Sequence, residues 1–299
     1  METTQFEAIA DYQDLCGEGP LWDSTRNSLF WTDLSGSRFY SYDWAQRSSR
    51  ILRSDLEICG FALNQPSGFV VVNTGGIWTW DGERQPVLVA SEVDGFPCRM
   101  NDCIADPRGR LLAGSCFYQT DGDYPLGHLL RVDADGSVEI LDDGIRLANG
   151  LGFSPDQGTL YFTDSAERLI YAYDYDVERG TVQRKRPFVR VPENEGLPDG
   201  LTVDAEGYVW SAQWFGSFIV RYDPDGRVER KVPVPAKQTS SVAFGGTELT
   251  DVFVTSANFS DSLPLAPPGY DPHDGYIGGK LFVANLGIPG KPEFRCRIA

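Results

Sequence analysis

The chain has 299 residues, of which 41% are hydrophobic and 12% aromatic, so a large buried core is expected and extended disorder is excluded. The net charge of −17 argues against nucleic acid and anionic membrane surfaces as partners, because both attract clusters of Lys and Arg. Such acidity fits a soluble protein with a cation site or a neutral substrate.

One block of sequence recurs six times along the chain. Each block opens on one residue and continues with an apolar strand, a turn and a second apolar strand. The opening residues, in chain order, are Glu18, Gly60, Asn101, Asn149, Asp199 and Ser240. The intervals between these positions are 42, 41, 48, 50 and 41 residues, as in a repeat with loop insertions.

Each block is expected to contain four antiparallel strands. The apolar runs are rich in β-branched and aromatic residues and are separated by Asp, Pro and Gly, as in hairpins. Second strands are expected at residues 28–33, 69–72, 110–114, 159–164, 208–211 and 252–255. Third strands are expected at residues 39–43, 77–81, 129–133, 170–174, 219–223 and 281–285. A more polar fourth strand follows in most blocks, as at residues 228–232.

Four-stranded units in a repeat of roughly 40–50 residues are the blades of a β-propeller. The sequence therefore predicts an all-β fold, a single six-bladed β-propeller domain over residues 1–299. The ring must close, because an open blade would leave an unpaired edge strand. We expect residues 5–9 to pair beside residues 293–297 and complete the last blade. Insertions at residues 118–126 and 263–279 are expected to shape access to a site.

Four opening residues carry a carboxyl or amide group at one phase of the repeat: Glu18, Asn101, Asn149 and Asp199. In a propeller the innermost strand of each blade lines the central channel, and the residue just before it lies at the channel mouth. Two carboxylates and two amide carbonyls would converge there. This all-oxygen set favours hard cations, namely Ca²⁺, Mg²⁺ or Mn²⁺. Taken singly, the pairs at 149–150 and 199–200 are also ordinary turn dipeptides.

Other catalytic chemistries find little support in the sequence. The chain has only two histidines, His128 and His273, and it has neither a G-x-S-x-G motif nor a nucleotide-binding glycine motif. What remains is metal-assisted attack of water on a carbonyl or phosphoryl group. Asp199 is the candidate general base, and a hydroxide on the ion is the competing base.

Five motifs run in order over nearly the whole chain. They occupy residues 16–22, 99–102 with 106–110, 149–151 with 154–156, 198–201 with 204–207, and 239–241 with 244–246. In these motifs the chain resembles the SMP-30/gluconolactonase family, the regucalcin-like sugar lactonases. The resemblance implies a six-bladed propeller with one divalent cation, and Ca²⁺, Zn²⁺, Mn²⁺, Mg²⁺ and Fe²⁺ all occur among relatives.

The resemblance also implies roles for individual residues. Glu18, Asn149 and Asp199 would hold the cation. Asn101 would be a further ligand or would contact the cation through water. The implied reaction is hydrolysis of a five- or six-membered aldonolactone to the aldonic acid, with Asp199 as general base.

The resemblance places Arg99 and Asn101 against the substrate's hydroxyls or ring oxygen. A guanidinium can donate two hydrogen bonds to oxygens or stabilise charge that develops on a carbonyl, although a surface arginine is the alternative. Some relatives carry a substrate-contacting Glu where this chain has Gln119, beside Tyr118. Losing that charge predicts contact with a different set of substrate hydroxyls.

Two other functions are compatible with a propeller. A paraoxonase- or organophosphatase-like enzyme would hydrolyse esters or phosphotriesters at a similar calcium site. A non-catalytic binding propeller is suggested by residues 30–33 and 161–164, which resemble the Tyr-Trp-Thr-Asp signature of secreted receptor domains. The start of the chain has no basic, apolar leader pattern, so a cytoplasmic location is expected.

Overall fold

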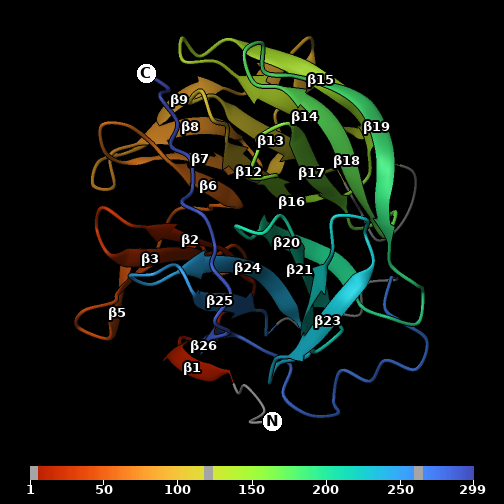
Figure 1. Cartoon of the computed structure of the whole chain (residues 1–299). Coiled ribbons are helices and arrows are strands. Elements are labelled where there is room, and N and C mark those ends of the chain that lie inside the picture. Colours follow the sequence, from red (N-terminus) through yellow and green to blue (C-terminus); the bar gives the residue numbers. More distant parts are fainter. Residues whose placement is uncertain (1–5, 118–123, 259–264) are drawn as a thin grey trace.

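The structure, a computed structural model, describes residues 6–117, 124–258 and 265–299. Its strands form six four-stranded antiparallel sheets around one axis, with the first strands in contact around the ring (Figure 1). This is the six-bladed β-propeller that the sequence predicts. Within these residues no helix is long and apolar enough to span a membrane.

Each blade contains four strands, taken here from the axis outwards. The first strands are β2 (Gly17–Asp23), β6 (Gly60–Leu63), β12 (Met100–Ala105), β16 (Ala148–Phe153), β20 (Leu197–Val203) and β24 (Thr239–Gly245). The second strands are β3 (Ser28–Asp33), β7 (Phe69–Asn73), β13 (Leu111–Ser115), β17 (Thr159–Asp164), β21 (Val209–Trp214) and β25 (Asp251–Ser256).

The outer half of each blade follows the same order. The third strands are β4 (Arg38–Asp43), β8 (Gly76–Trp80), β14 (Gly127–Val132), β18 (Leu169–Asp176), β22 (Phe218–Tyr222) and β26 (Lys280–Asn285). The fourth strands are β5 (Ser48–Arg53), β9 (Val87–Ala90), β15 (Val138–Ile145), β19 (Thr181–Arg190), β23 (Val228–Pro233) and β1 (Glu7–Asp11). A short hairpin, β10 (Glu92–Val93) with β11 (Phe96–Pro97), connects the second blade to the third. The predicted second and third strands are confirmed, with small shifts at their ends.

The ring closes where β1 pairs antiparallel with β26, so the last blade joins an N-terminal strand to three C-terminal ones. The predicted closure of the ring by an N-terminal strand is confirmed, but the prediction that this strand pairs with residues 293–297 is wrong, because its partner is β26. The segment after β26 contains Pro289 and Pro292, which lack the N–H that a strand ladder needs. β26 already offers a free edge beside β25, and β1 takes it.

The C-terminal segment, residues 286–299, instead crosses the end of the channel where the first strands finish (Figure 1). Ala205 N donates to Pro289 O at 2.9 Å. Cys296 N donates to Leu63 O at 2.7 Å, and Arg297 N donates to Gly109 O at 2.7 Å. These bonds tie the fifth, second and third blades together at the channel's far end.

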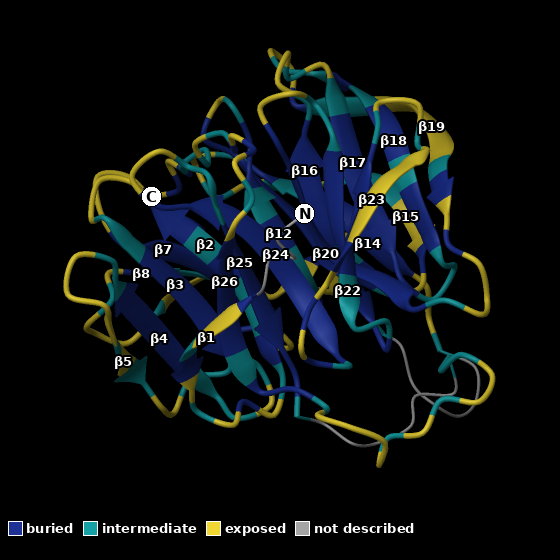
Figure 2. Ribbon diagram, turned by 60° about the horizontal axis from the view of Figure 1, so that its bottom comes forward, coloured by how far each residue is buried: buried dark blue, intermediate teal, exposed yellow. Residues whose placement is uncertain are grey.

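Burial decreases from the axis outwards (Figure 2). β20 is buried along its whole length, whereas β23 is exposed at all but one residue. The core lies between neighbouring blades, as where Leu112 of β13 belongs to one cluster with Phe153 of β16 and Phe162 of β17. Each blade therefore covers the apolar face of the next, and the first strands are held rigidly around the channel.

Candidate active site

The candidate site lies at the channel mouth, the end at which the first strands begin. Five of the six first strands change register against their second strands there. The changes fall between Glu18 and Leu21, Met100 and Asp102, Asn149 and Leu151, Pro198 and Leu201, and Thr239 and Ser241. Such bulges bend a strand and re-aim its side chains. The four opening residues with a carboxyl or amide group therefore lie inside the first strands, at bulges, and not before the strands as expected.

Two glycines bring neighbouring first strands together beside the candidate residues. A Cβ on Gly150 would lie 2.2 Å from the backbone N of Leu201, far inside van der Waals contact. A Cβ on Gly200 would lie 2.1 Å from Ser241 Oγ and 2.7 Å from Ser241 Cα. The Asn-Gly and Asp-Gly pairs are thus not turns here. Glycine follows Asn149 and Asp199 because the next blade passes too close for any side chain.

The two asparagines meet directly across the third and fourth blades. Asn101 Nδ2 donates to Asn149 Oδ1 at 2.8 Å and to Ala148 O at 2.7 Å. Asn149 Nδ2 donates to Ser165 Oγ at 2.8 Å, and that hydroxyl donates to Pro198 O at 2.6 Å. Because the amide nitrogens are engaged, the amide orientations are fixed and the Asn101 carbonyl oxygen is left for a ligand.

Glu18, Asp102 and Asp199 form a cluster of acidic side chains. Burial raises the pKa of Glu18 well above its ordinary value, and the charges of Asp199 and Asp102 raise it further. Burial, and then the charge of Asp102, raises the pKa of Asp199 in the same direction. Burial raises the pKa of Asp102 to about 7, although Cys103 N donates to Asp102 Oδ1 at 2.7 Å. Among the described residues no cationic side chain opposes these shifts.

This set of residues fits a divalent cation. Asp199 Oδ1 is buried and accepts no hydrogen bond from the described part of the chain, and such an orphaned oxygen is costly unless something binds it. A cation would also offset the repulsion within the acidic cluster. No three His, Cys, Asp or Glu side chains of the described ranges are grouped to hold a metal. The amide oxygens of Asn101 and Asn149 are therefore needed to complete the donor set.

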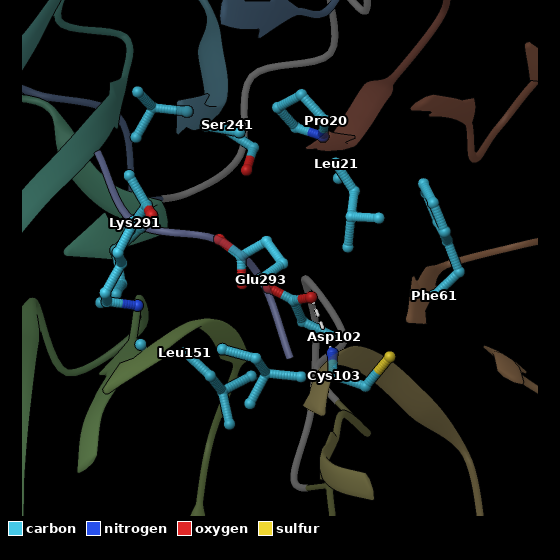
Figure 3. A pocket seen from close by; sticks show the side chains of 16 residues that line it. Pro20, Leu21, Phe61, Asp102, Cys103, Leu151, Ser241, Lys291 and Glu293 are labelled. Carbon is cyan, nitrogen blue, oxygen red and sulfur yellow. Dashed lines mark hydrogen bonds between the residues drawn. The ribbon is translucent and has the colours of Figure 1, made fainter. Parts of the chain in front are cut away.

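A cavity of about 60 Å³ continues along the channel behind the candidate site (Figure 3). Its wall includes residues that follow the candidate ligands in the first strands, such as Leu21, Leu151 and Leu201. Asp102 contributes a carboxyl group, and Lys291 and Glu293 of the C-terminal segment also line the cavity. The volume suits a few water molecules but not a sugar, so a substrate must approach from the mouth.

The predicted substrate residues are placed only in part. Arg99 is exposed between β11 and β12, next to Asn101. Burial raises the pKa of the Cys59 thiol, and the charge of Arg99 opposes that rise. Arg99 O accepts a hydrogen bond from Cys116 N at 2.9 Å, which holds the backbone at the mouth. Tyr118 and Gln119 lie outside the described residues.

Sequence reasoning missed two residues of this site. Asp102 directly follows Asn101 in one of the motifs, and this position in the sequence could have indicated that its carboxyl group lies at the channel. Ser165 carried no signal, because its contacts with Asn149 and Pro198 depend on how the fourth and fifth blades meet.

Comparison with known proteins extends over nearly the whole chain. Residues 16–258 match the model of the SMP-30/Gluconolactonase/LRE-like region. Pentonolactonase XacC of Haloferax volcanii is 36% identical over 292 residues, covering 97% of each chain. The 6-deoxy-6-sulfogluconolactonase of Pseudomonas putida is 32% identical over 291 residues, covering 96% of this chain and 97% of its own. The calcium-binding protein regucalcin of Agrobacterium tumefaciens superposes with a TM-score of 0.85 at 25% identity, covering 99% of this chain and 98% of its own.

The matched region contains all four candidate ligands and all six first strands. The similarity is therefore one of the complete ring and not of a single blade. The resemblance predicted from the five motifs is confirmed, and the chain belongs to the SMP-30/gluconolactonase/LRE-like family.

Proposed function

We propose that this protein hydrolyses a sugar lactone, an aldonolactone, to the aldonic acid with the help of one divalent cation. Two relatives similar over almost their full length are lactonases, and the predicted enzyme class, a lactone-hydrolysing hydrolase, is confirmed at that level. The cation would be held by Glu18, Asn149 and Asp199, with Asn101 as a further ligand or a contact through water. Oxygen donors favour Ca²⁺, Mg²⁺ or Mn²⁺ over Zn²⁺ or Fe²⁺.

One observation carries the proposal. Side chains from four blades, far apart in the chain, bring an acidic cluster and an amide pair to one end of the channel, and among the described residues no cationic side chain opposes the raised pKa values of Glu18 and Asp199. A structural role alone gives no reason to leave Asp199 Oδ1 buried without a partner. A neutral polyhydroxylated substrate also suits this acidic mouth better than an anionic one.

The reaction follows from these positions. A cation held by Glu18, Asn149 and Asp199 would supply Lewis acidity toward the lactone carbonyl oxygen and would make water more acidic. Asp199 accepts a proton from the water that adds to the carbonyl carbon. The ring C–O bond then breaks, and the same proton passes to the leaving alkoxide, which gives the hydroxy acid. Arg99 donates hydrogen bonds to substrate oxygens, and the Asn101 carbonyl oxygen accepts one from a substrate hydroxyl. Both contacts fix the orientation of the ring.

The test compares metal content with activity. Purified protein is dialysed, its bound metal is quantified, and ring opening is followed in a pH-stat with and without chelator. The panel contains aldonolactones, aryl esters and phosphotriesters, each corrected for spontaneous hydrolysis. We expect stoichiometric metal and chelator-sensitive opening of aldonolactones only. A propeller that keeps no metal, or one that prefers esters or phosphotriesters, would contradict the proposal.

Two variants locate the site. Asp199→Ala and Asn149→Ala should each lower the rate of lactone opening by on the order of 100-fold or more, because a ligand or base is lost. Asn285→Ala, which truncates an exposed asparagine on β26, is the matched control and should keep the rate. Full activity in either site variant would refute the assigned roles. The cytoplasmic location stays a prediction.

A further inference from the structure

Two buried aspartates occupy equivalent positions in the first and fourth blades, which face each other across the ring. Asp33 ends β3 and pairs with Gly17, the residue before Glu18. Asp164 ends β17 and pairs with Ala148, the residue before Asn149. Both side chains are almost inaccessible to solvent, with 0% and 1% of their surface exposed. Each carboxyl group therefore lies one residue from a candidate ligand, on the neighbouring strand.

Asp33 binds the backbone that leads into β2. Its carboxyl oxygens accept hydrogen bonds from Leu15 N at 3.1 Å and Cys16 N at 2.9 Å. It also accepts from Gly36 N at 3.0 Å in the turn that follows β3. The two amides belong to the residues three and two positions before Glu18. The approach to this candidate ligand is thus fixed to the rigid second strand.

Asp164 makes the same three contacts in the fourth blade. It accepts from Arg146 N at 2.9 Å, Leu147 N at 3.1 Å and Glu167 N at 3.4 Å. Arg146 and Leu147 again stand three and two positions before the candidate ligand, here Asn149. The pattern is repeated atom for atom although the sequences of the two approaches differ.

The residue after Asp164 extends this support to a third ligand. Ser165 N donates to Leu147 O at 3.0 Å, and its hydroxyl joins Asn149 to Pro198, the residue before Asp199. The corresponding positions of the third, fifth and sixth blades carry Ser115, Gln213 and Ser256, none of which has a carboxyl group.

A physical need for such support exists at these points. The first strands change register at Glu18 and Asn149, so the regular ladder is interrupted where the ligands must be held. A carboxyl group that accepts several backbone N–H bonds replaces the missing ladder contacts with charge-assisted ones. The geometry of metal ligands is sensitive to such outer contacts.

We propose that Asp33 and Asp164 are positioning residues that clamp the backbone before Glu18 and Asn149 and so preorganise the cation site. This inference rests on the proposed function, since it requires a cation at the mouth. Neither aspartate touches the cation or the substrate; each acts through the ligand that it places.

Asp164 offers the cleaner test. Asp33 also forms an ion pair with Arg38, which contacts Asp14 and Tyr12 O, so its loss would disturb the N-terminal packing as well. Asp164 has only backbone partners among the described residues. Asp164→Asn keeps the shape but turns one acceptor oxygen into an N–H₂ group that faces a backbone N–H.

Asp204 provides a control for a general loss of stability, since it also accepts from Trp210 Nε1 at 2.9 Å and forms a buried ion pair with Arg221. It is equally buried, and it accepts backbone hydrogen bonds from Glu206 N at 3.0 Å and Tyr208 N at 2.9 Å. It directly follows β20, so it lies at the far end of the channel. Asp204→Asn should therefore lower stability without changing the ligand geometry at the mouth.

The experiment measures cation affinity directly. Chelator-stripped wild type, Asp164→Asn, Asp33→Asn and Asp204→Asn are titrated with Ca²⁺ and, separately, Mn²⁺ by calorimetry, and unfolded in urea. We expect the dissociation constant of Asp164→Asn to rise on the order of 10–100-fold, the range typical for loss of an outer contact to a ligand. Excess cation should restore its lactonase rate. Asp204→Asn should bind the cation as the wild type does despite a lower urea midpoint.

Different outcomes refute different claims. An Asp164→Asn dissociation constant within twofold of the wild type overturns the clamp alone, as does equal weakening in Asp204→Asn, which would mark a general loss of stability. If Asp164→Asn does not fold, the Asp33→Asn titration decides in the same way. A wild type that binds neither cation overturns the proposed function and the clamp with it.

Discussion

Asp14 makes the stability of this protein depend on pH. It has 2% of its surface exposed and lies in the approach to β2. Tyr40 Oη donates to Asp14 Oδ1 at 2.6 Å, and Trp31 Nε1 donates to Oδ2 at 3.1 Å. Burial raises the pKa of Asp14 to about 6, with a further rise from the charge of Asp33 that outweighs the nearby Arg38.

The sign follows from the direction of the shift. An acid whose pKa rises on folding holds its proton more tightly in the folded state, so its stabilising contribution is full below a pH of about 3.8 and is lost as the pH rises through about 6. At about 1.36 kcal/mol per pKa unit, the full loss is ~3 kcal/mol. Of this, ~1.4 kcal/mol falls between pH 5 and pH 8, a window that avoids the isoelectric point near 4.5.

Asp14→Asn removes the titration and nearly keeps the shape. The free energy of unfolding is measured in urea at pH 5, 6, 7 and 8 for the variant and the wild type. Their difference should shift by ~1.4 kcal/mol in favour of the variant from pH 5 to pH 8. Asp225→Asn, at an exposed turn, controls for the lost charge. A difference that stays constant with pH would refute the reasoning, whatever its absolute size.

Two further predictions concern the site. Gly200→Ala should destabilise the protein by on the order of 2–3 kcal/mol and weaken cation binding, because its Cβ would lie 2.7 Å from Ser241 Cα and the strand that carries the neighbouring ligand must shift. Gly158→Ala, whose Cβ would meet nothing closer than 3.7 Å, is the control, and equal urea midpoints in both variants would contradict the argument. Gln119→Ala should change the relative rates across a panel of aldonolactones that differ in hydroxyl configuration. Unchanged relative rates, measured beside the wild type, would remove Gln119 from substrate recognition.

The repeat and the chemistry of the mouth could be read from the sequence because both are periodic. Strand alternation and turn residues recur in each block, so the strands and the blade count follow from local rules. The same position of the repeat is occupied by Glu18, Asn101, Asn149 and Asp199. In a closed ring of blades, equivalent positions lie at the same end of the channel. The prediction that these four side chains lie close together therefore required no information about individual contacts.

The tertiary structure decided what happens between blades. Gly150 and Gly200 allow the first strand of the following blade to pass against them, which only the three-dimensional structure shows. In the sequence, Asn149-Gly150 and Asp199-Gly200 are dipeptides typical of turns. β1 pairs with β26, whose backbone N–H groups are all available for a strand ladder, and not with the proline-containing segment 286–299. That segment instead closes the far end of the channel.

The contacts that hold the ligands were also beyond local rules. Asp33 and Asp164 are ordinary strand-end acids in the sequence, and Ser165 is an ordinary serine. Their partners lie 16–18 residues earlier, in or just before the first strand of the same blade, or 33 residues later in the next blade. Periodicity specifies which residues share a phase, whereas the register of each bulge and the approach of neighbouring blades arise only when the ring closes and its interfaces pack.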